Sequence, residues 1–211
     1  MKFVVAIDGT AASGKGTLGK KIAEHFDFHY LDTGILYRIV AYNLKHNSDF
    51  SKISKQKVQN SLNLLNNKNF NIINLRNEQI TLRASQVSNN KIVRDNLLLY
   101  QRSFALQNGG AVLDGRDIGT VVCPDADVKI FVNADVKIRA KRRYDQLIKN
   151  NKDLNLKKIL DDLSKRDNLD KNRECSPMVP AKDAFLLDTS NLTVEEALQK
   201  IIVIISKKLK K

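Results

Sequence analysis

Short apolar runs alternate with helically spaced apolar positions along most of this chain. The run Phe3–Ile7 is continuous and rich in β-branched residues, which is typical of a strand buried on both faces. The next segment, 14–26, carries its apolar residues at the spacing of a helix. Strands that alternate with helices predict an α/β fold with a parallel, doubly wound sheet.

The same patterns predict the remaining elements. Strands are expected at 29–31, 111–113, 128–132 and 186–188, and helices at 37–44, 58–65, 92–106, 135–149, 156–167 and from Thr193 onward. Thr193 and Glu196 have the spacing of a capping box, which indicates a helix start. The stretch 46–90 is polar and rich in asparagine. We interpret it as an insertion with two short strands at 70–75 and 79–82.

An excess of basic residues narrows the class of partner. The 211 residues include 36 Lys and Arg against 23 Asp and Glu, a formal net charge of +13. This charge favours anionic partners, namely nucleotides, nucleic acid or an anionic membrane surface. The apolar runs are too short for a signal peptide or a membrane span, and two cysteines make neither a disulfide framework nor a zinc site. We therefore expect a single-domain cytoplasmic protein.

The segment after the first predicted strand has the pattern of a phosphate-binding loop, Gly-x-x-x-x-Gly-Lys, from Gly9 to Lys15. Its glycines allow backbone N–H groups to turn inward around a phosphate. Lys15 supplies a charge for the β- and γ-phosphates, and the N-terminus of the following helix adds its dipole. Because Gly16 follows the lysine, Thr17 carries the hydroxyl that would lie near a magnesium ion. A strand-to-helix turn without a ligand is the weaker alternative.

Charged residues also follow other predicted strands. Asp114 and Arg116 come after the strand 111–113, and ligands bind at the carboxyl ends of such strands. We expect Asp114 near magnesium-bound waters and Arg116 near a phosphate. Arg38, one helical turn after Gly34, is placed to reach a phosphate as well.

Three charged residues near the end of the helix expected at 156–167 are spaced to lie on one helical face. They are Arg166, Asp170 and Arg173, at positions i, i+4 and i+7. An ion-paired surface helix is the alternative to a functional cluster.

Several motifs resemble those of a known family. The loop ending Gly14–Thr17 is typical of nucleoside monophosphate kinases. Four further segments resemble, in order, those of bacterial-type cytidylate kinases: Asp32–Arg38, Asp114–Val122, Arg166–Arg173 and Val179–Asp188. The resemblance runs from Phe3 to the last helix. It implies a phosphate-loop kinase core at 1–45, 91–136 and 171–211, a small acceptor-binding insertion at 46–90 and a helical lid at 137–170.

The resemblance implies that Mg²⁺ and ATP serve transfer of the γ-phosphoryl group to CMP or dCMP. The implied catalytic residues are Lys15, Asp114, Arg116 and Arg166. The implied ATP site comprises Gly9, Thr10, Ala11, Ala12, Ser13, Gly14, Lys15, Gly16, Thr17, Arg139, Arg142 and Arg143, with Thr17 on the metal. The implied acceptor site has Arg38, Arg116 and Arg166 on the phosphate, Thr33, Ser85, Arg94, Asp117 and Arg173 on the cytosine, and Tyr37 and Asp170 on the sugar.

The chain also departs from the family pattern. Thr10, Ala12 and Thr33 stand where the family often has Pro, Gly and Ser. The acceptor-side insertion is shorter than in other members. Within it, 84–87 and 93–94 match the later of two arginine-containing family segments, which assigns Ser85 and Arg94. Residues 79–82 with 87–88 also match the earlier segment.

Two other functions remain open. A sister kinase acting on UMP, AMP or a non-nucleotide acceptor would keep the phosphate loop, but we do not expect it to keep both Asp117 and Arg173. A nucleotide- or nucleic-acid-binding protein without kinase activity would fit the basic charge. Against it, the chain has no Trp, 6% aromatic residues and no nucleic-acid-binding motif. We expect a monomer whose partners are ATP and CMP or dCMP, with neither nucleic acid nor a membrane.

Overall fold

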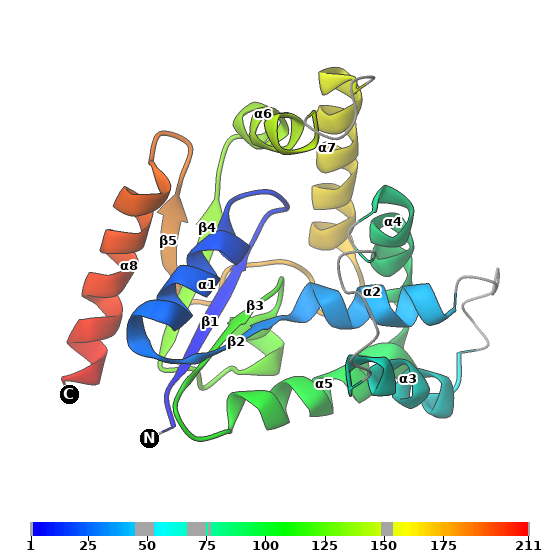
Figure 1. Ribbon diagram of the computed structural model, residues 1–211, viewed down its shortest axis with the longest axis horizontal. Helices are drawn as coiled ribbons and strands as arrows, with labels where there is room; N and C mark the ends of the chain where they lie inside the picture. The colour runs from blue at the N-terminus through cyan, green and yellow to red at the C-terminus, as the bar shows by residue number, and fades with distance from the viewer. Residues whose placement is uncertain (1, 45–52, 67–74, 76, 149–153, 211) are drawn as a thin grey trace. The chain divides into compact units, whose positions relative to one another are not determined.

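A five-stranded sheet in the order β2-β3-β1-β4-β5 organises the computed structural model, which describes residues 2–44, 53–66, 75, 77–148 and 154–210 (Figure 1). The strands are β1 (Val4–Gly9), β2 (His29–Asp32), β3 (Ala111–Asp114), β4 (Val128–Asn133) and β5 (Phe185–Asp188). β1 pairs in parallel with β3 and β4, and β4 pairs in parallel with β5. The register places Ile7 beside Asp114, so Asp8, Gly9 and Asp114 all lie at the carboxyl ends of their strands. The predicted parallel α/β sheet is confirmed.

The chain divides into two compact units, one of Met1–Leu31 with Ala105–Lys211 and one of Asp32–Phe104. The insertion predicted at 46–90 lies within the residues of the second unit, and the lid predicted at 137–170 within those of the first. Both sets of boundaries remain predictions.

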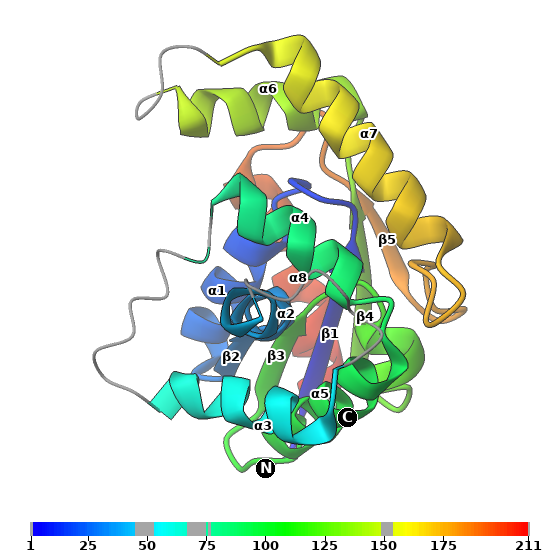
Figure 2. The same ribbon diagram turned by 90° about the vertical axis from the view of Figure 1, so that its right-hand side faces the viewer.

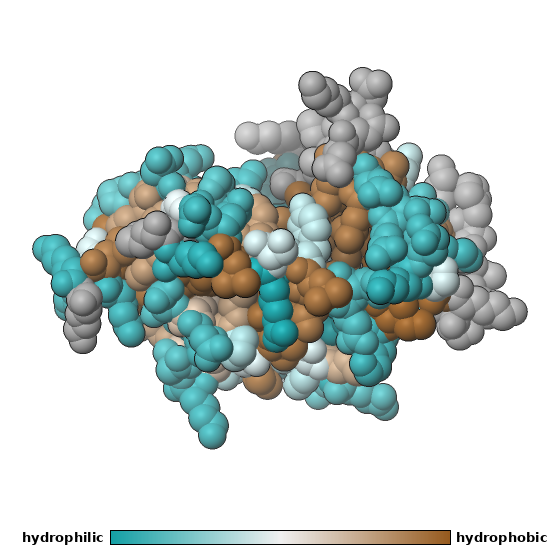
Figure 3. All heavy atoms as spheres, turned by 90° about the horizontal axis from the view of Figure 1, so that it is seen from below, coloured by the Kyte–Doolittle hydropathy of each residue, from teal (hydrophilic) through white to brown (hydrophobic). Residues whose placement is uncertain are grey.

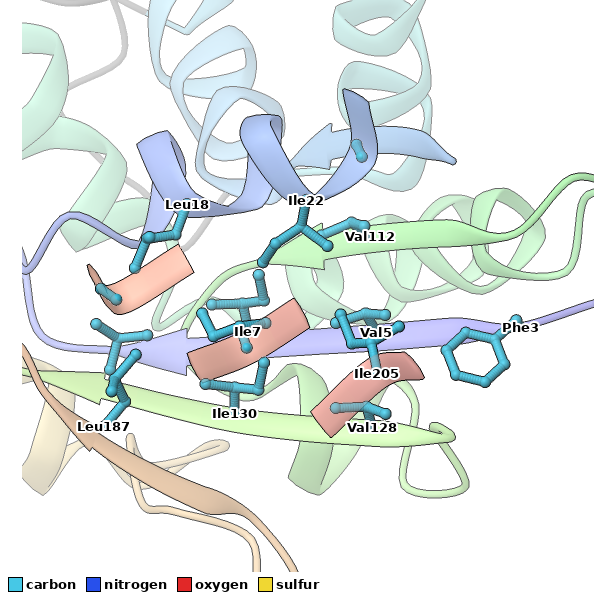
Figure 4. Packing of buried hydrophobic residues seen from close by; sticks show 14 residues of the cluster. Phe3, Val5, Ile7, Leu18, Ile22, Val112, Val128, Ile130, Leu187 and Ile205 are labelled. Carbon is cyan, nitrogen blue, oxygen red and sulfur yellow. The ribbon is translucent and has the colours of Figure 1, made fainter. Parts of the chain in front are cut away.

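Helices α1 (Lys15–Phe26) and α8 (Val194–Leu209) pack against each other and against the sheet. In Figure 4, Leu18 and Ile22 of α1 point at the strands, and Ile205 of α8 lies over them. The predicted capping box begins α8, because the Thr193 hydroxyl accepts the Glu196 N–H and the Glu196 carboxylate accepts the Thr193 N–H. This packing gives β1 and α1, which flank the phosphate loop, a rigid base.

Two further helices of the first unit, α6 (Val136–Leu147) and α7 (Leu156–Asn172), pack side by side in both Figure 1 and Figure 2. Buried Ile159 and Leu163 of α7 and Ala140 of α6 cluster with Ala11 of the phosphate loop. One π-helical turn, η4 (Ile118–Val122), follows β3 and contacts β1. α7 runs beyond the expected end at 167, so it carries Arg166 and Asp170 within the helix.

The second unit is helical. It contains α2 (Thr33–Asn43), α3 (Lys55–Leu62), η2 (Asn63–Asn66), α4 (Glu78–Val87) and α5 (Lys91–Ala105). α2 packs against α3 and α4, and Figure 2 shows α2 end-on with α4 above it and α3 below it.

The strand predicted at 79–82 is wrong, because these residues belong to α4. The Asn77 side chain accepts the Ile80 N–H at 2.8 Å and caps the helix. Ile80, Ala84 and Val87 are buried at helical spacing, whereas Leu82 is 60% exposed. The two-residue spacing of Ile80 and Leu82 therefore matches the period of a strand, although both residues belong to a helix. Of the strand predicted at 70–75, only Leu75 lies among the described residues.

The surface mixes polar and apolar side chains. On the face shown in Figure 3, hydrophilic residues, drawn in teal, project between hydrophobic ones, drawn in brown. Within the described residues, no helix is long and apolar enough to cross a membrane. Cys123 and Cys175 are half-buried, and neither forms a disulfide bond.

Candidate active site

The predicted phosphate loop connects β1 to α1 and is shaped by three residues with positive φ. Gly9 has φ of 144° and Gly14 has φ of 90°, both of which favour glycine. A Cβ on Gly9 would lie 1.9 Å from the Val132 carbonyl oxygen, so no larger residue fits there. Ala12, where the family often has glycine, adopts φ of 59°. The loop thus keeps its shape despite the strain of one left-handed alanine.

Hydrogen bonds within unit 1 hold this loop in place. The Lys15 side chain is 7% exposed, and its Nζ donates to the Thr10 carbonyl at 3.0 Å. The Ser13 hydroxyl donates to the same carbonyl at 3.0 Å. The Thr189 hydroxyl, just after β5, donates to the Ser13 carbonyl at 3.1 Å. Thr17 is exposed in the first turn of α1.

Asp114 lies beside the start of α1. The Tyr30 hydroxyl donates to its Oδ2 at 2.8 Å, and a Cβ on Gly16 would come within 3.1 Å of the same oxygen. Only 6% of Asp114 is exposed. The glycine at 16 thus leaves room for this carboxylate next to the loop.

Two arginine–aspartate pairs connect the segment after β3 with α7 and its C-cap. Arg116 Nε donates to Asp170 Oδ2 at 2.8 Å, and Arg166 Nε lies 4.0 Å from the same oxygen. Burial alone would lower the pKa of Arg116, but the ion pair with Asp170 raises it above its ordinary value. Burial opposes ionisation of Asp170 too, yet Arg116 and Arg166 lower its pKa overall. Both groups therefore stay charged near neutral pH.

The second pair joins Arg173 to Asp117. Arg173 Nη2 donates to Asp117 Oδ1 at 3.2 Å, and Arg173 Nε donates to the Ser176 carbonyl. The side chains are 5% and 9% exposed. Arg173 is the C-cap of α7 with an extended backbone, so it does not continue the helical face of Arg166 and Asp170. The fold nevertheless brings both pairs together in unit 1, where Arg116, Arg166 and Arg173 all lower the pKa of Asp170.

Asp8, which sequence reasoning missed, is a buried carboxylate at the end of β1. Its two oxygens accept the N–H groups of Ile118 and Gly119 at 2.7 and 2.8 Å. Burial raises the pKa of Asp8 to about 6, although the two backbone hydrogen bonds act in the opposite direction. The signal was present, because Asp8 lies near the carboxyl end of a parallel strand, as Asp114 does.

The predicted lid arginines contact protein groups. Arg139 is buried, pairs with Asp167 at 2.7 Å and donates to the Ala11 carbonyl at 3.0 Å. Asp167 also accepts the Ala11 N–H at 3.3 Å, so the two side chains clamp the phosphate loop. Arg142 donates to the Thr189 carbonyl at 2.6 Å, and Arg143 is half-buried on α6. Sequence reasoning missed Asp167, which no local pattern distinguishes from other helix-surface acids.

The remaining predicted acceptor residues belong to the second unit. Arg38 lies 3.8 Å from Asp32, and Thr33 is buried at the start of α2. The Arg94 guanidinium lies 5.7 Å from the centre of the Tyr37 ring, a cation–π distance.

Buried Arg94 also donates to the Ser88 carbonyl at 3.1 Å, and the Ser88 hydroxyl donates to the Ser85 carbonyl. Arg94 therefore connects Tyr37 with the turn after α4, and the proposed cytosine residues Ser85 and Arg94 are linked through Ser88.

Comparison with known proteins finds similarity along almost the whole chain. A family model described as cytidylate kinase matches residues 5–207. The cytidylate kinase of Bartonella henselae is 48% identical over 196 residues, covering 92% of this chain and 89% of that protein. The cytidylate kinase of Bradyrhizobium diazoefficiens is 46% identical over 203 residues, covering 96% and 95%.

Similarity to a solved structure supports the same fold at much lower sequence identity. An uncharacterized protein from Eubacterium ventriosum matches with a TM-score of 0.59 and 16% identity, covering 97% of this chain and 98% of that one. At that identity the likeness concerns the fold alone.

Because the family match extends over residues 5–207 and the relatives share nearly half of their aligned residues with this protein, the chain belongs to the cytidylate kinase family.

Proposed function

We propose a residue-level mechanism for this protein, which as a member of its family is an ATP-dependent kinase of CMP and dCMP. The observation that carries it is the grouping, within unit 1, of the phosphate loop with the Arg116–Asp170 and Arg173–Asp117 pairs. The loop suits the phosphates of a donor nucleotide, and the paired arginines suit an anionic acceptor.

On the donor side, we assign the ATP phosphates to the loop residues Gly9 to Thr17, with Lys15 as the main charge. The resemblance adds Arg139, Arg142 and Arg143 as donor contacts. Arg139 is paired with Asp167 in the structure, so contact with a phosphate would require that pair to open.

The residues near the start of α1 fit a magnesium ion. Mg²⁺ prefers oxygen ligands and retains several waters. Thr17 offers an exposed hydroxyl, and the Asp114 carboxylate lies beside Gly16. We propose that Thr17 would hold the ion and Asp114 its waters, and the ion would neutralise charge on the donor phosphates.

On the acceptor side, we assign the CMP phosphate to Arg38, Arg116 and Arg166, because guanidinium groups bind phosphate through paired hydrogen bonds. The cytosine is assigned to Thr33, Ser85, Arg94, Asp117 and Arg173, and the sugar to Tyr37 and Asp170. The Asp117 carboxylate accepts hydrogen bonds and the neighbouring Arg173 guanidinium donates them. Together they suit the edge of a base that carries both hydrogen-bond donors and hydrogen-bond acceptors.

The chemical step is attack of an acceptor phosphate oxygen on the γ-phosphorus of ATP, with ADP as the leaving group. The acceptor oxygen is already ionised near neutral pH, so no general base is required. The protein contributes alignment and neutralisation of the charge of two anionic partners. Closure of α6 and α7 over the donor would exclude water.

We also propose that the protein acts in the cytoplasm as a monomer, with small nucleotides as its partners. A reducing compartment is supported by Cys123 and Cys175, which form no disulfide bond.

Acceptor-dependent ADP release tests the mechanism directly. Purified protein with Mg-ATP is supplied separately with CMP, dCMP, UMP, AMP or no acceptor. We expect rapid turnover with CMP and dCMP alone. Preference for another acceptor would refute the cytosine assignments while leaving the donor site intact. Salt-sensitive nucleic-acid binding without turnover would favour the non-kinase alternative.

A further inference from the structure

Asp8 is buried at the boundary between β1 and the phosphate loop, yet its hydrogen bonds go to a different segment. Its carboxylate accepts the N–H groups of Ile118 and Gly119 at 2.7 and 2.8 Å. These two residues begin η4, directly after Arg116 and Asp117 in the chain. The first N–H groups of a helical turn have no partner within the turn and need an acceptor from elsewhere.

Such acceptors normally come from the residue that precedes the helical turn, here Asp117. The Asp117 side chain makes no capping hydrogen bond, and its Oδ1 instead accepts from Arg173 at 3.2 Å. Asp8 therefore performs the capping that Asp117 would otherwise perform. The consequence is that the Asp117 carboxylate is available for Arg173.

We propose that Asp8 is a positioning residue for acceptor recognition, which holds the 114–122 segment so that Arg116 and Asp117 are set for CMP. This inference rests on the roles proposed above for Arg116, Asp117 and Arg173. Asp8 itself touches neither nucleotide in the proposal and acts through the η4 backbone.

The surroundings of Asp8 support a specific hydrogen-bonding role for its carboxylate over a role in packing alone. Gly119 lies directly against the carboxylate, because a Cβ there would be in ordinary contact with Asp8 Oδ2, at 3.4 Å, and 3.2 Å from Lys129 Cδ. A buried carboxylate is a costly acceptor compared with an amide or hydroxyl. Its two oxygens, however, each accept one of two neighbouring N–H groups, whereas an asparagine would turn its own NH2 donor toward one of them.

Asp8→Asn tests the proposal, with Asp127→Asn as the matched control. Asp127 also accepts a backbone N–H of β1, that of Val4 at 2.7 Å, but at the opposite end of the strand. Values of kcat and KM are measured for CMP, UMP and ATP. We expect Asp8→Asn to raise the KM for CMP by about tenfold, which corresponds to one lost hydrogen bond, and to reduce the preference for CMP over UMP. The KM for ATP should change less than about twofold, and the control should match the wild type.

The companion variants Asp117→Asn and Gly119→Ala complete the design. Combining Asp8→Asn with Asp117→Asn should add little to either change alone, because both act on one contact. If Asp8→Asn does not fold, Gly119→Ala, which adds a Cβ 3.2 Å from Lys129 Cδ and in contact with the same carboxylate at the start of η4, should raise the KM for CMP selectively.

The outcomes separate this inference from the proposed function. An unchanged KM for CMP in the Asp8 and Gly119 variants, with Asp117→Asn impaired, would overturn the role of Asp8 alone. An unimpaired Asp117→Asn enzyme would instead refute the proposed cytosine contacts.

Discussion

The raised pKa of Asp8 predicts an unusual dependence of stability on pH. Burial holds the pKa of this carboxyl at about 6 in the folded chain, against an ordinary value of 3.8. Between these values the folded protein binds more protons than the unfolded chain. The contribution of Asp8 to the free energy of unfolding is therefore largest below pH 4 and is lost as the pH rises through 6. This is opposite in sign to the behaviour of Asp170, whose pKa is lowered.

The magnitude follows from the size of the pKa change. One pKa unit corresponds to about 1.4 kcal/mol, so the rise from 3.8 to about 6 is worth about 3 kcal/mol in total. About 2 kcal/mol of this falls between pH 4 and pH 7. Asp8→Asn removes the titration. The difference in unfolding free energy, wild type minus variant, should therefore fall by about 2 kcal/mol over that range.

Urea unfolding at several pH values, followed by circular dichroism, measures this difference directly. Subtracting the variant cancels the other carboxyl groups, which titrate in both proteins. Asp127→Asn, treated identically, should show no comparable fall. A difference that stays flat, or that rises with pH, would show that the Asp8 carboxyl is not held in the buried, costly state argued here.

Three further substitutions probe the site. Gly9→Ala places a Cβ 1.9 Å from the Val132 carbonyl oxygen, so we expect a loss of about 3 kcal/mol or more in urea unfolding, together with weaker ATP binding by calorimetry. Ala12→Gly should relieve the left-handed backbone at φ of 59° and raise stability by about 1 kcal/mol, with little change in the KM for ATP; a destabilised variant would contradict the strain. Arg173→Met removes the cation beside Asp117 and should reduce the preference for CMP over UMP by about tenfold or more in steady-state assays, and an unaltered preference would argue against a base contact.

Local sequence patterns predicted the phosphate loop and most elements because the forces behind them act over a few residues. Gly9 and Gly14 occupy positions with positive φ, where glycine is favoured for steric reasons. Thr193 and Glu196 form the capping box that their spacing indicated. The misassigned strand at 79–82 shows the limit of such patterns, since a short alternation of apolar residues fits a strand or one side of a helix equally.

Contacts between distant residues could not be predicted in the same way. Asp8 and Ile118 are 110 positions apart, and no spacing rule relates them. Asp167 binds Ala11 from 156 positions away and holds Arg139 at the same time. Asp167 looks like any acidic residue on an exposed helix face in the sequence. It becomes a partner of the loop only because of the way α7 packs over the loop.

By itself, therefore, the amino-acid sequence determined the class of fold, the phosphate loop and the family, because glycine conformation, apolar spacing and ordered motifs are local properties. Only the tertiary structure decided the partners of the charges: Asp8 with the η4 backbone, Arg116 with Asp170, and Arg173 with Asp117. The physical reason is that a buried charge requires a nearby partner of opposite sign or a hydrogen-bond donor. Chain folding supplies that partner from a distant part of the sequence.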